Sequence, residues 1–336
     1  MNESLRSIKS ENVKAVFNAV AEGGRVSRAS ISEKIGLSLV SVGKIVEALI
    51  CENVFLEEKR INEGAGRRAG ILRINTDKFV TVIRKKEKET SIGFFSLEMR
   101  EIGRVELKSD ESFDDALAEC AMTVLNIYGA ENCIGVGIIS DNTDEWDDVV
   151  KQTQAFFPDK NIKIDSPIRA ATLATMEYLD KDELGMYVYM NGGEVRGAFV
   201  MNNGLVPNQD GYSADFGGIR MNNGIHVSDI LSRAEDMEQT AQIITGFTYN
   251  ISRVVHMRAS VFEVKGSYDL TKLFARVNEL LDESYLNSEE EKPKVIYMND
   301  ANGVDYCNRG IIMNLRDRWL DNAIMNVRSR NRSMNT

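Results

Sequence analysis

Apolar side chains along the first 75 residues recur with the period of an α-helix in three successive segments, and two short β-like runs follow. The first segment places Val13, Val16, Phe17 and Val20 at the i, i+3, i+4, i+7 spacing that buries one stripe of a helix. Two glycines then end the pattern. The spacing predicts that a small helical unit opens the chain.

Serines mark the starts of the next two predicted helices, because a serine hydroxyl accepts hydrogen bonds from the free N–H groups of a first turn. Ser27 precedes a helix that holds Ile31 and Ile35, and Gly36 fits the left-handed residue that closes it. Ser38 precedes a third helix after a very short turn. This arrangement predicts a helix-turn-helix, in which the start of the second helix of the pair enters the DNA major groove.

The third predicted helix has one apolar face, and the side chains near its start point away from that face. The apolar face consists of Val42, Ile45, Val46, Leu49 and Ile50. The outward side chains of Val40, Ser41 and Lys44 are therefore expected to meet base edges and phosphates. The full set expected to contact DNA from the helices is Ser27, Arg28, Ser38, Val40, Ser41 and Lys44.

A loop rich in glycine and arginine, at 61–70, lies between the two β-like runs at 55–60 and 71–75. Its glycines let the backbone approach a partner closely, and Arg67 and Arg68 suit phosphates or the narrow minor groove. The loop and its flanking runs predict the wing of a winged helix-turn-helix. The alternative is a small helical module that contacts another protein and carries a solvated arginine loop.

The charge distribution separates this N-terminal unit from the rest of the chain. Residues 1–75 contain 12 lysines and arginines and 9 acidic residues, a net charge of +3; the whole chain carries −10, which leaves −13 for the remainder. Because an acidic body repels phosphate, DNA contacts are expected from the N-terminal unit alone. They are also expected to weaken as salt rises.

Length and composition favour a cytoplasmic protein of about two to three domains, with 336 residues of which 43% are hydrophobic. No apolar run approaches the roughly 20 residues that cross a bilayer, and the polar N-terminus lacks a signal-peptide pattern. No membrane contact is therefore expected. Cys51, Cys120, Cys133 and Cys307 lie far apart, which predicts reduced core thiols rather than disulfides or a zinc site.

Strand-like and helix-like segments alternate after residue 75. Strands are expected at 78–84, 90–96, 103–109, 132–140, 186–191, 197–206, 260–266 and 294–298, and helices at 114–129, 167–179, 235–257, 269–284 and 307–324. A strand hairpin followed by strand and helix repeats occurs twice, which favours two ribonuclease H-like (actin-like ATPase) lobes over one doubly wound sheet. The predicted fold class is α/β, with an N-terminal winged helix-turn-helix at 1–75. A first lobe is expected at 76–165, completed by the C-terminal helix at 308–330, and a second lobe at 166–307.

The order of these parts resembles the ROK family (repressor, open reading frame, kinase), whose repressors join a winged helix-turn-helix to an actin-like sugar-kinase body. The similar segments are 27–58, 64–75, 134–140, 169–178, 191–206, 213–218 and 308–313. The resemblance implies a transcription regulator, of the repressor type, that binds double-stranded operator DNA. It also implies a homo-oligomer, a dimer or a tetramer, since the two-fold symmetry of the protein is mirrored in a pseudo-palindromic operator.

Several positions depart from the kinase motifs of that family. The phosphate-binding D-x-G-G-T aligns with 83–90, which contains no glycine. Pro167 stands where the N-D-x-N motif has its aspartate base, and proline cannot take a proton. The nucleotide-side glycines are reduced to 191–197, where Glu194 would repel a polyphosphate. The departures imply no catalytic residue, no kinase activity and no cofactor.

Metal binding is not expected either. Gly218 aligns with the histidine of the family's A-G-E-x-G-H motif, and the cysteine loop that holds zinc in the family is missing. His226 and His256 are the only histidines, and neither has the spacing of a metal ligand.

Three residues, Ser166, Arg169 and Asp215, align with the sugar contacts of the family. An arginine in place of an amide favours a carboxylate or phosphate over a neutral hexose, so an effector between the lobes is expected to be anionic, a sugar acid or a sugar phosphate. The alternative is that Arg169 pairs with Asp215 or another acid and closes an empty cleft. Two other functions also remain open: a sugar kinase with an appended DNA-binding domain, and an interaction scaffold with a vestigial helix-turn-helix.

Overall fold

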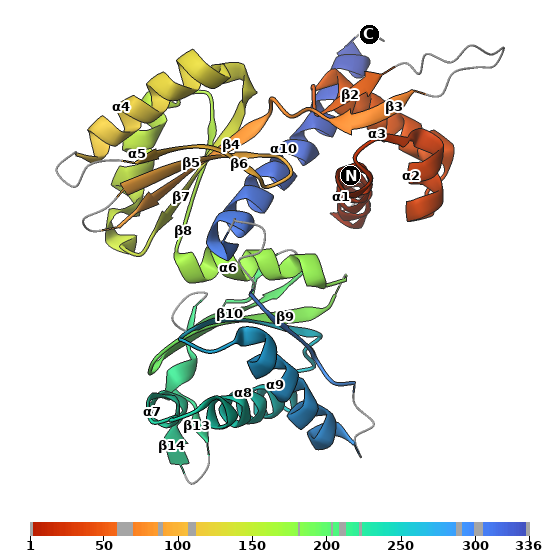
Figure 1. The fold of residues 1–336 in the computed structure, drawn as a ribbon. Coiled ribbons are helices and arrows are strands. Elements are labelled where there is room, and N and C mark those ends of the chain that lie inside the picture. Colours follow the sequence, from red (N-terminus) through yellow and green to blue (C-terminus); the bar gives the residue numbers. More distant parts are fainter. Residues whose placement is uncertain are drawn as a thin grey trace.

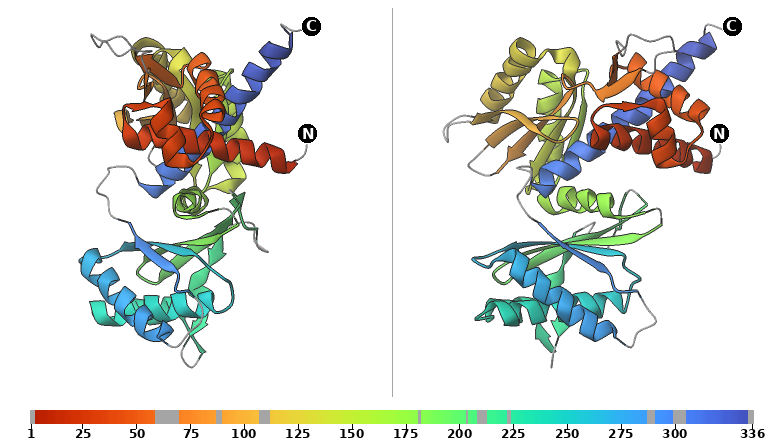
Figure 2. Two further views of the ribbon diagram at one scale, coloured as in Figure 1. Left: turned by 90° about the vertical axis from the view of Figure 1, so that its right-hand side faces the viewer. Right: turned by 45° about the vertical axis from the view of Figure 1, so that its right-hand side comes forward.

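Three parts joined by one long helix make up the computed structural model of this chain (Figure 1). The structure describes residues 3–58, 70–86, 90–106, 112–180, 182–202, 204–207, 213–221, 224–286, 291–298 and 305–333. The N-terminal module and the first lobe lie side by side at one end of the molecule, and the second lobe lies at the other end (Figures 1 and 2).

The N-terminal module contains three helices and a three-stranded antiparallel sheet of order β1-β3-β2. Its elements are α1 (Glu3–Gly23), β1 (Val26–Ser27), α2 (Arg28–Ile35), α3 (Leu39–Cys51), β2 (Phe55–Glu58) and β3 (Ile71–Ile74). The predicted apolar faces are buried together: Val16, Phe17, Val42 and Leu49 are each 0% exposed. The pattern of helices and hairpin strands that the sequence predicts over 10–75 is therefore present.

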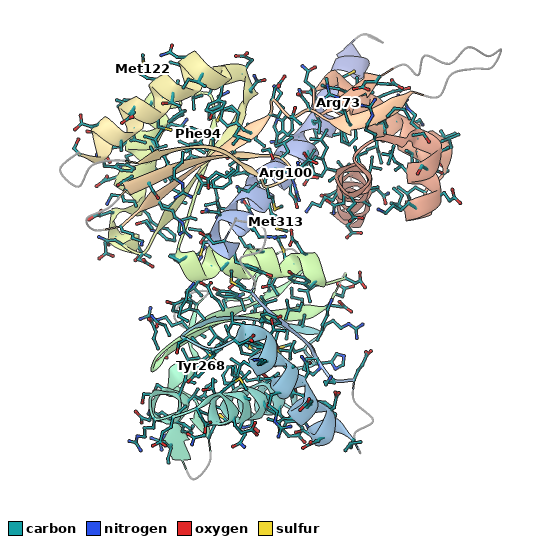
Figure 3. All side chains as sticks on the ribbon, in the orientation of Figure 1. Arg73, Phe94, Arg100, Met122, Tyr268 and Met313 are labelled. Carbon is teal, nitrogen blue, oxygen red and sulfur yellow. The ribbon has the colours of Figure 1, made fainter. Side chains whose placement is uncertain are left out.

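The first lobe is a five-stranded sheet of order β6-β5-β4-β7-β8, with β4, β5 and β6 antiparallel and β7 and β8 parallel to β4. Its strands are β4 (Phe79–Lys85), β5 (Thr90–Ser96), β6 (Glu101–Glu106), β7 (Cys133–Ser140) and β8 (Asn161–Asp165). Its helices are α4 (Phe113–Thr123), the short turns η1 (Val124–Tyr128), η2 (Ala130–Asn132) and η3 (Thr143–Glu145), and α5 (Trp146–Phe156). Phe94 of β5 is buried in the core between the sheet and α4 (Figure 3).

The second lobe repeats the same order of strands, β11-β10-β9-β15-β16, with β12 added beside β10. Its strands are β9 (Leu184–Asn191), β10 (Glu194–Met201), β11 (Gly204–Leu205), β12 (Ala214–Asp215), β13 (Arg220–Met221), β14 (Ile225–His226), β15 (Ala259–Lys265) and β16 (Lys294–Tyr297). Its helices are α6 (Pro167–Ala174), η4 (Thr175–Tyr178), η5 (Phe216–Gly218), α7 (Val227–Ser232), α8 (Met237–Ser252) and α9 (Leu270–Tyr285). The repeated order agrees with the two-lobed α/β fold that the sequence predicts.

The long helix α10 (Tyr306–Ser333) connects all three parts (Figures 1 and 2). Its first half crosses α6 so closely that a Cβ on Gly310 would lie 1.7 Å from the carbonyl oxygen of Ala170. Ile311 and Leu315 pack on the first lobe, and Leu320 is buried in the core of the N-terminal module. The body and the N-terminal module therefore share one continuous helix.

Some sequence predictions differ from the structure. The helix α5 and the strand β8 were not predicted, and the helix expected over 235–257 is the shorter α8. The cysteines are free, but Cys51 is exposed and so is not a core thiol. Burial raises the pKa of Cys307 to about 12. Within the described residues, no helix is long and apolar enough to span a membrane, and no group of histidine, cysteine and acidic side chains could hold a metal ion.

Candidate DNA-binding surface and interlobe site

The start of α3 presents two apolar side chains to solvent. Leu39 is 55% exposed and Val40 is 69% exposed. The hydroxyl of Ser38 caps the helix by accepting from the N–H of Ser41 at 3.1 Å, and the two hydroxyls lie 2.9 Å apart. The helix therefore begins where the sequence predicts, and the predicted outward residues face solvent.

Lys44 lies one turn after Val40 on the same exposed face of α3. It forms no ion pair with any residue in the described part of the chain. Gly43 stands next to it, and a Cβ added there would meet nothing within 4 Å. Packing within the module does not require glycine at this position, although glycine inside a helix costs about 0.5–1 kcal/mol relative to alanine.

Ser27 and Arg28 occupy structural positions at the start of α2. The hydroxyl of Ser27 accepts from the N–H of Ser30 at 3.2 Å, and Gly36 closes the helix with φ +69°. The Arg28 guanidinium makes a bidentate ion pair with Glu57 on β2, and hydrogen bonding to Glu57 raises the pKa of Arg28. Ser27 thus caps the helix as predicted, and the Arg28–Glu57 ion pair connects α2 to the sheet.

The predicted wing arginines, Arg67 and Arg68, lie outside the described residues. The strands on either side of that loop are described, and β2 pairs with β3 in antiparallel register from Phe55 opposite Ile74 to Glu58 opposite Ile71. The strands of the predicted hairpin are therefore present.

A buried carboxylate, Asp165, lies at the end of β8 in the interlobe region. It is 1% exposed, and it pairs with Arg169 at 2.5 Å between Oδ1 and Nε and with Lys163 at 3.3 Å between Oδ2 and Nζ. The Arg169 guanidinium also lies over the Trp146 ring, 5.5 Å from its centroid. Arg169, on α6 of the second lobe, is therefore paired with an acid at the end of the last strand of the first lobe.

The other two predicted effector residues cap short helices. Ser166 caps α6 by accepting from the N–H of Arg169 at 3.4 Å, with Pro167 in the first turn. Asp215 caps η5 of the second lobe by accepting from the N–H of Gly217 at 3.0 Å, and it is otherwise exposed. The structure thus joins Ser166 and Arg169 at one helix start and places Asp215 at another.

The segments aligned with phosphate-binding motifs lie at the ends of paired antiparallel strands. In the first lobe, β4 ends at Lys85 opposite Thr90, and Lys85 pairs with Glu145 at 2.6 Å. In the second lobe, Asn191 lies opposite Glu194, so that Gly192, with φ +55°, and Gly193 form the tight turn. Lys85 is thus held in an ion pair, and Gly192 and Gly193 are held in a turn, while residues 87–89 of the first segment lie outside the described residues.

Sequence reasoning missed Asp165, Lys163 and Leu39. A signal for Asp165 is present, because a carboxylate four residues before an arginine at a helix start favours an i, i+4 pair. The exposure of Leu39 has no such signal, since an apolar residue at a helix start is also compatible with burial.

Solved structures with ROK names share this fold. A ROK family transcriptional regulator, described as a homologue of the E. coli MLC protein, is 14% identical, with a TM-score of 0.60 over 95% of this chain and 99% of that chain. A ROK family protein from Streptococcus pneumoniae, solved in complex with sucrose, is 10% identical, with a TM-score of 0.55 over 71% of this chain and 98% of its own. A ROK hexokinase from Thermus thermophilus is 11% identical, with a TM-score of 0.51 over 71% of this chain and 100% of its own.

No family model and no curated protein matches the chain in sequence. The match to the regulator extends over nearly the whole chain, whereas the other two matches cover 71% of it. At these identities the likeness establishes the architecture alone. The chain therefore shares the α/β fold of these ROK structures.

Proposed function

We propose that this chain is a transcription regulator of the repressor type, which binds operator DNA through a winged helix-turn-helix formed by its first 75 residues. The observation that carries the proposal is the exposed start of α3, where Leu39, Val40, Ser41 and Lys44 face solvent together. The full-length likeness to a ROK transcriptional regulator supports it.

The chemistry of this face suits a major groove. Thymine presents a methyl group there, which favours contact with apolar side chains such as Leu39 and Val40. Lys44 suits a phosphate, and the hydroxyl of Ser41 can donate to or accept from a base edge. Gly43 leaves room for the backbone of α3 to approach the bases, which gives a reason for a glycine that packing does not require.

The remaining predicted DNA contacts follow from the same docking. Ser27 and Ser38 lie at helix starts, whose N–H groups suit phosphate oxygens. Arg67 and Arg68 would extend the wing to the minor groove. Arg28 contributes indirectly, because it holds α2 against the β2 strand that leads into the wing. A homo-oligomer would present two such modules to a pseudo-palindromic operator.

We also propose that the body has no kinase activity. Pro167 stands at the position aligned with the catalytic base, and the glycines aligned with the nucleotide loop form a hairpin turn. The second candidate function is a sugar kinase, which the likeness to a ROK hexokinase favours. An assay of ADP release with ATP and a panel of hexoses and amino sugars distinguishes the two functions. Turnover above background would favour the sugar kinase.

An effector at Ser166, Arg169 and Asp215 would have to displace Asp165 from Arg169. The observed Arg169–Asp165 pair supports the alternative in which an acid of the protein occupies the arginine and closes this site. If the site does take a ligand, a carboxylate or phosphate remains the expected partner of Arg169. Thermal-shift screening that compares neutral sugars with sugar acids and sugar phosphates tests this expectation.

Selection of duplexes from a randomised DNA library by the full chain tests the proposed function. We expect a pseudo-palindromic consensus, with thymines under α3. The variant Val40→Asp places a carboxylate at the groove without touching the core, so it should abolish the selection. A matched change on the far lobe, Val254→Asp, alters another exposed valine and should leave the selection intact. Failure to enrich any sequence would contradict the proposal.

A further inference from the structure

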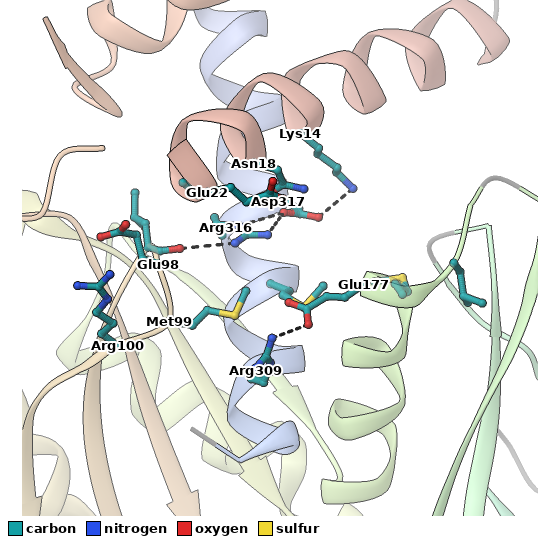
Figure 4. Close-up of a pocket in the computed structure, with 15 residues that line it drawn as sticks. Lys14, Asn18, Glu22, Glu98, Met99, Arg100, Glu177, Arg309, Arg316 and Asp317 are labelled. Carbon is teal, nitrogen blue, oxygen red and sulfur yellow. Dashed lines mark hydrogen bonds and ion pairs between the residues drawn. The ribbon is translucent and has the colours of Figure 1, made fainter. Parts of the chain in front are cut away.

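A cavity of about 820 Å³ opens where the N-terminal module, the first lobe and α6–η4 meet (Figure 4). Its walls come from α1, the β5–β6 turn, η4 and α10, and none of the residues expected to bind DNA or an effector lines it. A cavity of this size, with charged groups around it, is within the range of small-molecule sites, about 300–1,000 Å³.

Arg316 of α10 lines this cavity with a guanidinium that lies over the Phe17 ring, 4.8 Å from its centroid, and whose hydrogen bonds are all long. Its side chain is only 9% exposed. Its hydrogen bonds reach Asp317 at 3.3 Å and the carbonyl oxygen of Leu97 at 3.5 Å. Good N–H···O bonds measure about 2.7–3.2 Å, so this buried cation has N–H groups that a better acceptor would satisfy.

Arg309 lies two turns before Arg316 on the same wall. Its Nη2 pairs with Glu177 of η4 at 2.5 Å, while its buried Nε has no hydrogen-bond partner. Figure 4 shows both guanidiniums on the cavity side of α10, with Met99 on one side and Glu177 on the other. The same wall thus carries two arginines that are each paired with a carboxylate, and the Arg309 Nε–H has no acceptor among the described residues.

The charges that line the cavity offset one another when Arg309 and Arg316 are counted, because Lys14, Arg100 and these two arginines stand against Glu22, Glu98, Glu177 and Asp317. Glu177 is paired with Arg309, Asp317 with Lys14 at 2.9 Å, and Glu22 with Lys34 outside the cavity. The β5–β6 turn contributes one charge of each sign, Glu98 and Arg100. Three methionines complete the wall: Met99, Met176 and Met313. Methionine side chains adapt to the shape of a small organic body.

Arg309 and Arg316 are seven residues apart on one helix, which places their Cα atoms about 10 Å apart along its axis. We propose that the cavity binds a small organic dianion, a bisphosphate or a comparable dicarboxylate, with one anionic group on each of these arginines. The methionines contact the carbon skeleton between the two groups. Because Asp317 also holds Lys14 of α1, a ligand that recruits Arg316 changes the contact between α10 and the N-terminal module.

Tryptophan fluorescence can locate the ligand, because the chain has two tryptophans. Trp319 lies one turn beyond Arg316 on α10, and Trp146 lies beside Arg169. The full chain with Trp146→Phe is titrated, without DNA, with fructose 1,6-bisphosphate, fructose 6-phosphate and fructose. The Trp319 signal should respond to the bisphosphate, and the dissociation constant should rise about tenfold or more for each phosphate removed, since charge-assisted hydrogen bonds are worth about 1.5–3 kcal/mol.

Arginine variants then assign the two phosphates. The Arg309→Gln variant should bind the bisphosphate only as well as the protein with both arginines binds the monophosphate. The Arg316→Gln change should weaken bisphosphate binding further. Arg276→Gln removes another arginine from an ion pair, with Glu238, on the second lobe and should have no effect. Circular dichroism confirms that the variants are folded.

Three results would overturn the proposal. The first is no response to the bisphosphate at concentrations up to about 10 mM. The others are equal affinity for fructose and its bisphosphate, and binding that survives both arginine changes. In the counterpart variant Trp319→Phe, a Trp146 signal that depends on Arg169 would instead place the ligand between the lobes. The titration contains no DNA, so its failure is independent of the proposed function.

Discussion

Two helices of this protein, α3 and α6, begin with the same kind of cap but differ in whether the side chains of their first turn have partners within the chain. Each starts with a serine cap, Ser38 or Ser166, whose hydroxyl accepts from the N–H three residues later. At α3 the side chains of the first turn face solvent, with Val40 69% exposed. At α6 the corresponding turn carries Arg169, which is already paired with the buried Asp165.

The comparison shows that local sequence determines the helix start but not whether its side chains are available. The α3 start belongs to a small module whose core lies on the other side of the helix, so its outer face stays open. The α6 start lies directly after a buried strand that ends in a carboxylate, so its arginine finds a partner within the chain. An exposed face without internal partners is the better candidate for contact with another molecule.

The largest expected effect comes from breaking the buried pair at α6. Asp165→Asn removes the charge that Arg169 and Lys163 share, and such a loss costs about 3–5 kcal/mol when the pair is fully buried. Since both cations are partly exposed, a value near 3 kcal/mol is expected. Urea unfolding of the full chain measures it. Lys44→Ala on α3 is the control and should leave stability unchanged; equal effects of the two changes would contradict the comparison.

Two glycines extend the comparison to the backbone. Gly310→Ala forces a Cβ toward the Ala170 carbonyl and should destabilise the body by about 1–3 kcal/mol. Gly43→Ala has open space around it and should stabilise the module by about 0.5–1 kcal/mol. The same Gly43→Ala change should weaken duplex binding, because the added methyl group lies at the groove. Stronger or unchanged duplex binding would show that α3 does not approach the bases closely.

The wing arginines test whether the second predicted contact surface acts with α3. Arg67→Ala and Arg68→Ala should each cost about 1–3 kcal/mol at a selected operator if they read the minor groove. Fluorescence anisotropy with the selected duplex and with a scrambled one gives the two affinities. If both changes weaken the two duplexes equally, the arginines contact phosphates rather than bases.

Much of this organisation could be predicted from the sequence, and the exceptions have physical causes. The caps at Ser27, Ser38 and Gly36 depend on local chemistry and are where the sequence predicts them. The helix α5 was missed because only Val149 and Thr153 are buried along it, too few for an apolar stripe. The pairing of Arg169 was left open, because the partner of a charged group depends on tertiary packing.

The contacts that α10 makes with the N-terminal module escaped sequence reasoning, although the C-terminal helix expected at 308–330 is present as Tyr306–Ser333. The pattern over 307–324 predicts a helix, but its role in joining the lobes to the N-terminal module depends on contacts between distant segments. The sequence indicates that Leu320 is a core residue but not to which domain it belongs. The structure places it in the same core as Val42 and Leu49.

Salt dependence of duplex binding tests the central claim, that the open face of α3 contacts DNA, most directly. The full chain and Lys44→Ala are titrated with the selected duplex over a salt series, and Lys151→Ala is the control because this lysine is 76% exposed on the acidic body. If Lys44 neutralises one phosphate, its removal should reduce the slope of log K against log salt by about one unit, while Lys151→Ala leaves the slope unchanged. Equal slopes for all three proteins would contradict the assignment of α3 to DNA.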